Sequence, residues 1–177
     1  MIRDGFSKFF WGFLFIMFNF RIQGFDILPD VIGFILFAVG FRTLARESDS
    51  FERAKLFNFG LIFLSLFSLY QSPNREGEFN PLGFFVGIAT LVLLLIVVHH
   101  LLAGIKDMAS RQERPDLVAE AGQKWTYFLV FQIATLLLFV MILIPPLFVV
   151  MGLALFVVAI VLMIILMRFM SRCGEQL

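Results

Sequence analysis

Long stretches of the sequence contain no charged residue, and these stretches predict helices that cross a lipid bilayer. Three of them are long enough by themselves, because a membrane-spanning helix needs about 20 apolar residues. They cover residues 81–105, 125–144 and 147–167. A fourth apolar stretch, residues 56–70, reaches spanning length if Lys55 and Gln71 lie at the membrane surface.

The first two apolar stretches, residues 9–20 and 31–41, are shorter. Each needs its flanking residues to span a bilayer, so they form either two short crossing helices or a re-entrant hairpin. The chain is therefore predicted to be an all-α, polytopic transmembrane helix bundle, with six membrane segments arranged as three helical hairpins. We expect a single integral membrane domain over residues 1–177, with segments at about 6–21, 27–45, 54–71, 81–104, 125–144 and 147–168.

Two connections between these segments carry charged residues that predict local structure. Residues 105–124 contain four basic and four acidic side chains, and we expect a cytoplasmic connector there. Within it, Pro115 is expected to open a short helix that Gly122 closes. The Asp49-Ser-Phe-Glu52 sequence has the spacing of a capping box, which predicts that the third helix starts before its apolar stretch.

Lysine and arginine are distributed unevenly between the two sets of connections. With six crossings, one set and both termini hold twelve Lys and Arg, whereas the other set holds Arg21 and Arg75. The side of a membrane protein that is richer in Lys and Arg faces the cytoplasm, so both termini are expected there. A re-entrant first hairpin would give the same distribution, so the charges do not decide between the two threadings.

The composition agrees with a membrane protein, since 60% of the residues are hydrophobic and 15% are charged. Soluble domains have roughly 45–50% apolar and about 25% charged residues. The net charge of +1 gives no basic surface for nucleic acid. The single Cys173 excludes an intrachain disulfide. Motifs for phosphate, zinc or a nucleophilic serine are absent from the sequence, so we predict no enzyme activity, cofactor or metal.

The sequence QGFDILPDVIGFILFAVG, residues 23–40, places two carboxylates where the second membrane segment should begin. If Pro29 is the first residue of that helix, Asp30 lies in its first turn, where the helix dipole favours a negative charge. Asp26 then lies in the preceding turn, near Arg21. In this interpretation the two aspartates mark the outer end of a helix and have a structural role.

The same residues also permit a functional interpretation. Asp26, Asp30, Gly33 and Gly40 fall on one face of a continuous helix, and this face would be acidic and narrow. Short membrane segments interrupted by Gly or Pro are where transporters place ion and substrate sites. A cation or proton site at the outer mouth of the bundle therefore stays open as the alternative.

Other polar and small residues in the apolar stretches are candidates for helix packing. Gly83 and Gly87 have the G-x-x-x-G spacing that lets two helices approach closely, within one chain or between two copies. Gln132 is expected to form a hydrogen bond between helices. The same role is expected for the hydroxyl side chains of Ser65, Ser68, Thr90 and Thr135.

His99 and His100 are adjacent near the cytoplasmic end of the fourth segment. Adjacent helical residues point about 100° apart, so the two imidazoles cannot bind one metal ion from a single face. We expect them to anchor the helix at the membrane surface, with a proton relay as the alternative.

The stretch RIQGFDILPDVIGFILFAVGFRTLA, residues 21–45, resembles a signature of small, functionally uncharacterised multipass membrane proteins of Gram-positive, Bacillus-type bacteria. The F-D-I-L-P-D-x-I-G core carries the resemblance. It implies a bacterial cytoplasmic membrane and a recurring role for Asp26, Pro29, Asp30 and Gly33. It implies no particular activity.

Three classes of function follow from these residues. The first is a small non-enzymatic membrane protein that contacts lipid and acts as a subunit or interaction partner of an assembly, or as a homo-oligomer. The second is a small oligomeric transporter or channel, with Asp26 and Asp30 at its outer mouth. The third is a membrane enzyme acting on lipid, which would need His99 or His100 to meet an acid. The first class is the leading prediction.

Overall fold

The computed structural model describes residues 2–17, 21–22, 25–26, 30–69, 81–140 and 145–177 of the chain. These ranges contain six α-helices and one two-stranded β-hairpin. The helices are α1 (Ile2–Met17), α2 (Asp30–Leu44), α3 (Asp49–Leu69), α4 (Pro81–Arg111), α5 (Pro115–Val140) and α6 (Pro145–Gln176). The hairpin strands are β1 (Arg21–Ile22) and β2 (Phe25–Asp26). The predicted all-α architecture with six helices is confirmed.

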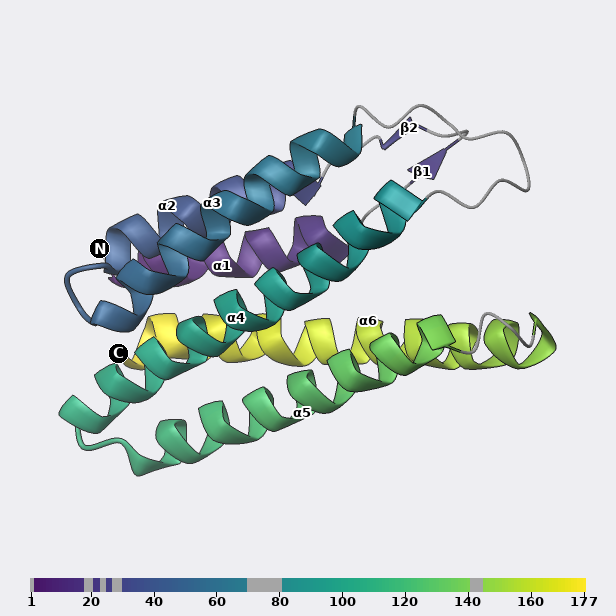
Figure 1. The fold of residues 1–177 in the computed structure, drawn as a ribbon. Coiled ribbons are helices and arrows are strands. Elements are labelled where there is room, and N and C mark those ends of the chain that lie inside the picture. The colour runs from purple at the N-terminus through teal and green to yellow at the C-terminus, as the bar shows by residue number, and fades with distance from the viewer. Residues whose placement is uncertain (1, 18–20, 23–24, 27–29, 70–80, 141–144) are drawn as a thin grey trace.

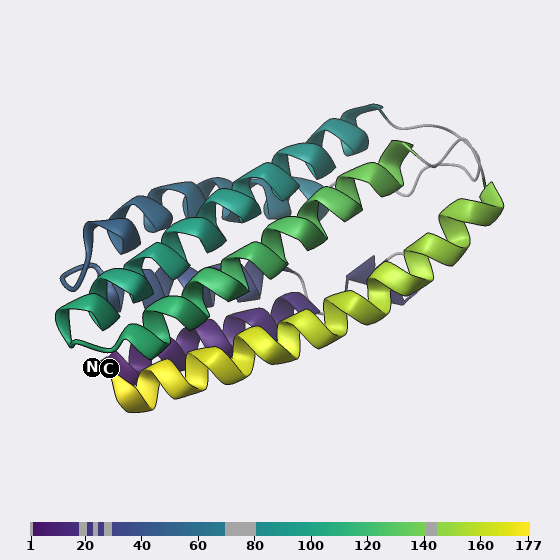
Figure 2. The ribbon, with the colours of Figure 1, turned by 90° about the horizontal axis from the view of Figure 1, so that it is seen from below.

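The six helices form a closed ring in which consecutive helices run in opposite directions (Figures 1 and 2). Each helix packs against the next one along the chain, and α6 returns to pack against α1. Both termini therefore lie at the same end of the bundle (Figure 2). The α2–α3 and α4–α5 connections lie at this end too, and the β-hairpin lies toward the opposite end (Figure 1).

Glycine lets α1 and α2 approach closely. A Cβ atom added at Gly33 would lie 2.6 Å from Cγ1 of Ile16 and 2.9 Å from the carbonyl oxygen of Gly12. About two turns further along α2, a Cβ at Gly40 would lie 2.7 Å from the ring of Phe9. A larger residue at Gly33 would force these two helices apart, since the contacting atoms include backbone, and one at Gly40 would displace the buried ring of Phe9.

Phenylalanine fills the space that α1, α2 and α3 enclose. The ring centroid of Phe9 lies 4.8 Å from that of Phe41 and 6.4 Å from that of Phe51. Phe13 and Phe37 form a similar pair, with centroids 4.8 Å apart and nearly perpendicular rings. All five side chains are buried. Such aromatic pairs add about 0.5–1.5 kcal/mol each beyond the burial of area.

The N-terminus of α3 is capped by Ser48, and not by Asp49 as the capping-box spacing predicted. The Ser48 Oγ accepts a hydrogen bond from the Ser50 N–H at 3.2 Å, because Asp49 is already the first residue of the helix. The hydroxyls of Ser48 and Ser50 also donate to Asp107 Oδ2, at 2.6 and 3.2 Å. The start of α3 is therefore tied to the end of α4. The prediction that α3 begins before its apolar stretch is confirmed.

The connector predicted at residues 105–124 is almost entirely helical. α4 continues to Arg111 and α5 begins at Pro115, so residues 112–114 alone separate them. Pro115 opens α5 itself, and not a separate short helix. Gly122 lies inside α5 and closes nothing. The physical reason is that no residue between 115 and 124 terminates the helix, because one glycine costs only about 1 kcal/mol.

Two of the helices are long and apolar enough to cross a membrane, over Leu82–Arg111 and Leu147–Gln176. α1 and α2 have 16 and 15 residues and are therefore about 24 and 22 Å long. The hydrocarbon core of a bilayer is about 30 Å thick. Without their flanking residues, α1 and α2 are therefore shorter than the hydrocarbon core, as the short apolar stretches predicted.

Burial changes sharply along α4, α5 and α6. Toward the end with the termini, buried side chains are frequent in what we call the packed segments, residues 97–109, 117–128 and 162–173. Toward the other end lie the open segments, residues 82–96, 129–138 and 147–161. Gln132 is the one buried residue in these three open segments. In these three helices the buried side chains therefore lie mainly at the end with the termini.

Candidate functional site

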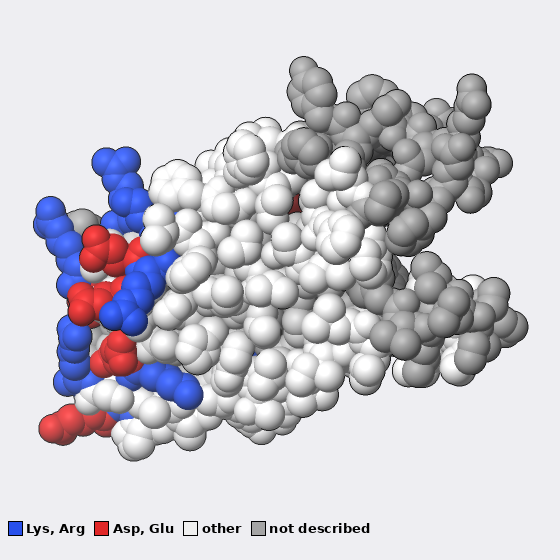
Figure 3. All heavy atoms as spheres, viewed as in Figure 1, with Lys and Arg blue, Asp and Glu red and all other residues white. Residues whose placement is uncertain are grey.

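Charged side chains gather at the end of the bundle that holds both termini (Figure 3). This end contains twelve of the 14 Lys and Arg residues: Arg3, Lys8, Arg42, Arg46, Arg53, Lys55, Lys106, Arg111, Arg114, Lys124, Arg168 and Arg172. The visible face of the middle of the bundle carries almost no charge (Figure 3). The connections that the sequence predicted to be rich in Lys and Arg therefore lie together at one end of the molecule.

The middle of the bundle exposes large apolar side chains on every helix. One from each helix illustrates this surface: Trp11, Ile35, Phe63, Phe85, Val130 and Phe156. Phe63 and Phe85 are 71% and 69% exposed. Apolar surface that extends over several helices is unfavourable in water, so such helices pack against lipid or against other helices.

At the charged end, the ion pair between Glu120 and Arg172 joins α5 to α6. Glu120 accepts a hydrogen bond from Arg172 at 2.9 Å and lies 3.4 Å from the Lys124 ammonium. Arg114 binds Asp116 through two hydrogen bonds of 3.1 and 3.0 Å. The hydrogen bond from Arg114 lowers the pKa of the Asp116 carboxyl below its ordinary value. These contacts fix the end of the helices without creating a reactive group.

The two aspartates of the 23–40 motif lie in different elements. Asp30 is the first residue of α2 and is partly buried, whereas Asp26 belongs to strand β2. The expected helical face shared by both aspartates is therefore absent, because the helix starts after Asp26. The register of the hairpin sets Asp26 directly opposite Arg21 on the neighbouring strand. Pro29 lies outside the described residues.

The glycines of this motif serve the packing of α1 against α2. Gly33 and Gly40 are buried, and both face α1 through the close contacts given above. The narrow helical face that the sequence predicted is present from Gly33 to Gly40. Its acidic part is reduced to Asp30 at the N-terminal end of the helix. The geometry thus places one partly buried carboxylate at the end of a tightly packed helix pair.

Gly87 has no packing partner among the described residues, since no heavy atom lies within 4 Å of a Cβ built there. Gly83, one turn earlier, is partly buried. Within the described chain, no neighbouring helix approaches α4 closely at Gly87. The G-x-x-x-G spacing was expected to pack against a helix of the same chain or of a second copy. The described part of the same chain provides no such helix at Gly87.

His99 and His100 contact aromatic rings on two different helices. The His99 ring lies 4.6 Å from Trp125 of α5, measured between centroids, in a T-shaped arrangement. The His100 ring stacks on Phe57 of α3, with centroids 5.9 Å apart and an angle of 5° between the planes. The two imidazoles thus pack against different helices, although their own ring centroids lie 5.5 Å apart in a T-shaped arrangement. Within the described ranges, no group of three or more His, Cys, Asp or Glu residues could hold a metal ion.

The polar residues in the apolar stretches divide into two kinds. Gln132 Nε2 donates to the Leu91 carbonyl at 3.1 Å, which confirms the predicted hydrogen bond between helices. The hydroxyls of Ser65, Thr90 and Thr135 instead donate to carbonyls of their own helices. A hydroxyl three or four residues after a carbonyl reaches it more readily than a second helix. The side chain of Ser68 lies outside the described part.

Asn58 is a buried polar residue that the sequence reasoning missed. Its Nδ2 donates to the Phe34 carbonyl of α2 at 2.7 Å, and the side chain is fully buried. Its Oδ1 has no hydrogen-bond partner among the described atoms. A single Asn in the predicted 54–71 segment was the available signal, because a buried amide in an apolar helix must bind something.

No family model, curated protein or solved structure matches this chain. The function proposed below therefore rests on its own residues and their arrangement.

Proposed function

We propose that this chain is a small non-enzymatic multipass protein of a bacterial cytoplasmic membrane, and that it acts as a subunit or interaction partner of a membrane assembly. The observation that carries this proposal is the contrast along α4, α5 and α6. Their open segments expose apolar side chains on three adjacent helices, whereas their packed segments are filled. Apolar surface without internal neighbours is where lipid or another membrane helix packs.

The membrane placement is supported by the two long apolar helices and by the charge-free middle of the bundle. In the proposed threading all six segments cross as three hairpins, and the charged end faces the cytoplasm. The alternating helix directions and the gathering of twelve Lys and Arg residues at one end support this threading. In this threading, the β-hairpin between α1 and α2 extends this pair of short helices toward the outer surface.

The threading can be tested with single cysteines and an impermeant thiol reagent on intact cells. Cys173 is fully buried, so the natural chain gives a low background. A cysteine in place of Asp26 should label from outside, whereas one in place of Arg46 should label only after permeabilisation. Labelling of both from outside, or of neither, would contradict the six-crossing threading with cytoplasmic termini.

The non-enzymatic assignment is supported by the aromatic surroundings of His99 and His100. Each ring contacts an aromatic side chain, and the two contacts lie on α5 and α3. Among the described residues, neither imidazole forms a hydrogen bond to Asp or Glu, the kind of contact that orients a histidine acting as a base. Replacing both by Ala should leave every cellular phenotype of the protein unchanged.

The proposed function is tested by gentle detergent extraction of a tagged chain, followed by quantitative mass spectrometry. We expect one membrane protein, or a second copy of this chain, at a fixed stoichiometric ratio. Gly87→Leu should lower the recovered partner at least tenfold. The space beside Gly87 is open within the chain, and the added side chain would fill it and so block a partner that packs there. Ser7→Leu is the matched control on exposed α1 surface. Extraction of a monomer without any stoichiometric partner would overturn the proposal.

The transporter remains the second candidate, and the partly buried Asp30 at the outer end of α2 is the observation that favours it. Its test is a cation or proton flux in proteoliposomes. Asp30→Asn should abolish the flux while the helix content is retained, and Asp4→Asn at the charged end should leave it unchanged. Absence of any flux with the natural chain would remove this candidate.

A further inference from the structure

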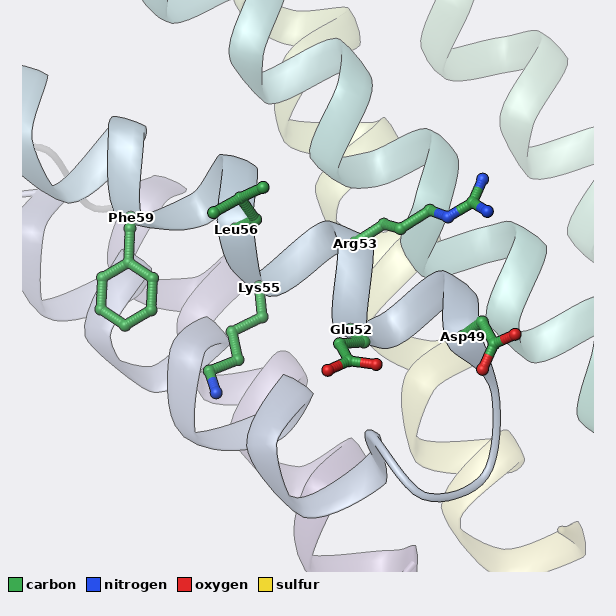
Figure 4. A pocket seen from close by; sticks show the side chains of 6 residues that line it. All are labelled: Asp49, Glu52, Arg53, Lys55, Leu56 and Phe59. Atoms are coloured by element: carbon green, nitrogen blue, oxygen red, sulfur yellow. The ribbon is translucent and has the colours of Figure 1, made fainter.

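An open cavity of about 660 Å³ lies along the exposed face of α3, where the charged end meets the apolar middle of the bundle (Figure 4). Its described lining comes from the first three turns of that single helix. These residues are Asp49, Glu52, Arg53, Lys55, Leu56 and Phe59. Neither the sequence motifs nor the proposed function uses this cavity.

The cavity has a polar part and an apolar part, in the order that a lipid requires. The four charged residues come first along α3, and Leu56 and Phe59 follow, with 71% and 53% of their surface exposed. Phe63 and Leu66 continue the exposed apolar surface at helical spacing, away from the charged end. A ligand with a polar head and a long apolar tail could therefore lie along α3.

The charges in the cavity are not satisfied by one another. Within the described part of the chain, Glu52, Arg53 and Lys55 form no ion pair, although Glu52 and Lys55 are three residues apart. Figure 4 shows Glu52 and Lys55 on the same side of α3, whereas Arg53 extends away from them. The ion pairs of Glu120 and Asp116 at the same end show that neighbouring charges do combine elsewhere.

We propose that this cavity binds the headgroup of a phospholipid that carries both a phosphate and a primary ammonium, that is, a phosphoethanolamine lipid. Lys55 binds the phosphate and Glu52 accepts hydrogen bonds from the ammonium, while Leu56 and Phe59 contact the acyl chain. This inference rests on the proposed membrane location of the chain.

Other headgroups fit the same residues less well. An anionic headgroup without an amine could bind Lys55, but it would have no N–H to donate to Glu52 and would lie beside that carboxylate. A choline headgroup has no N–H to donate to Glu52, and its recognition generally uses several aromatic rings. Phe59 is the one aromatic side chain in the described lining.

The test is native mass spectrometry of the full chain in detergent, incubated in turn with phosphatidylethanolamine, phosphatidylglycerol and phosphatidylcholine. We expect one phosphatidylethanolamine to remain bound at collision energies that remove the other two lipids. The variant Glu52→Gln with Lys55→Gln should lower this bound fraction about tenfold. The control variant Asp4→Asn with Arg42→Gln removes one acid and one base at the same end, on exposed positions, and should not change it.

Three results would overturn the proposal. One is equal retention of the three lipids, or equal retention by the natural chain and the Glu52/Lys55 variant. The second is preferential retention of phosphatidylglycerol that only Lys55→Gln abolishes, which would mark a simple anion site. The third is binding of soluble phosphoethanolamine as tightly as the lipid, which would assign the cavity to a free metabolite.

The failure of this inference and the failure of the proposed function give different results. If the chain is released from membranes by alkaline carbonate, the membrane proposal itself fails and the lipid assay has no meaning. If the chain stays in the membrane and its partner is recovered, but no lipid is selected, only the headgroup site is wrong.

Discussion

The packed and open segments of α4, α5 and α6 belong to the same three helices, yet their glycines have opposite surroundings. In the packed part, a Cβ at Gly104 would lie 2.6 Å from the ring of Phe51. In the open part, a Cβ at Gly87 would meet nothing within 4 Å, and one at Gly152 would meet only Leu138, at 3.9 Å. The open segments contain no charged residue, whereas the packed segments include Lys106, Glu120 and Arg168, so hydrophobicity alone does not decide which part packs. Close fit of small and aromatic residues does.

The largest expected effect comes from shortening matched phenylalanines of α6. Phe169 is 1% exposed in the packed segment, and Phe156 is 63% exposed in the open segment. Phe169→Ala should lower the free energy of unfolding by about 3–5 kcal/mol, because it leaves a cavity. Phe156→Ala should change it by less than about 0.5 kcal/mol. Loss of helical circular dichroism on titration with a denaturing detergent measures both. Equal losses would break the comparison.

The next effect has opposite signs at two glycines of α4. Gly104→Ala should destabilise the fold by about 1–3 kcal/mol, since the added carbon overlaps the buried ring of Phe51. Gly87→Ala should stabilise it by about 0.5–1 kcal/mol, because alanine favours the helix and the space is open. The same denaturation assay compares them. A destabilising Gly87→Ala in a monomer would show that a neighbour packs there.

Two buried amides allow a finer comparison. Gln132→Leu removes the hydrogen bond to the Leu91 carbonyl and should cost about 0.6 kcal/mol. Asn58→Leu removes a hydrogen bond to Phe34 and also an oxygen without a partner, so the two effects should nearly cancel. A loss of more than about 2 kcal/mol for Asn58→Leu would show that Oδ1 binds a group that matters for stability.

The smallest effect concerns acid sensitivity at the charged end. Arg114 lowers the pKa of Asp116 in the folded state, so the pair stabilises the fold above the unfolded pKa of about 4. This contribution is lost as the pH falls through the lower, folded pKa. Asp116→Asn should therefore flatten the dependence of the unfolding temperature on pH below about pH 4. An unchanged slope would mean that this exposed pair contributes nothing.

The apolar stretches predicted six helices and their order, because each helix is built around one stretch without charge. They did not predict the lengths of the helices at the charged end, where α4 and α5 continue through residues 106–111 and 115–124. Charged residues there resembled a solvated connector. In the structure they are helical, and the hydrogen bonds from Ser48 and Ser50 to Asp107 hold the end of α4 against the start of α3.

The candidate site residues were predicted less completely. The packing role of Gly33 and Gly40 follows from a helical period, and the close contacts with α1 agree with it. The position of Asp26 does not follow, because a helical period cannot locate the residue at which a helix begins. Asn58 was missed because its role depends on a hydrogen bond to the Phe34 carbonyl of α2. Phe34 lies 24 residues earlier in the chain.

The contact between α1 and α6 has a consequence for biosynthesis. A Cβ at Gly174 would lie 3.1 Å from Cβ of Phe6, so the two helices touch near the termini. The ribosome makes α1 first and α6 last of the six, and the buried face of α1 therefore waits for a neighbour until translation reaches α6. An interrupted chain would leave an unclosed ring with that aromatic face uncovered, which is the kind of surface that membrane quality-control proteases can recognise.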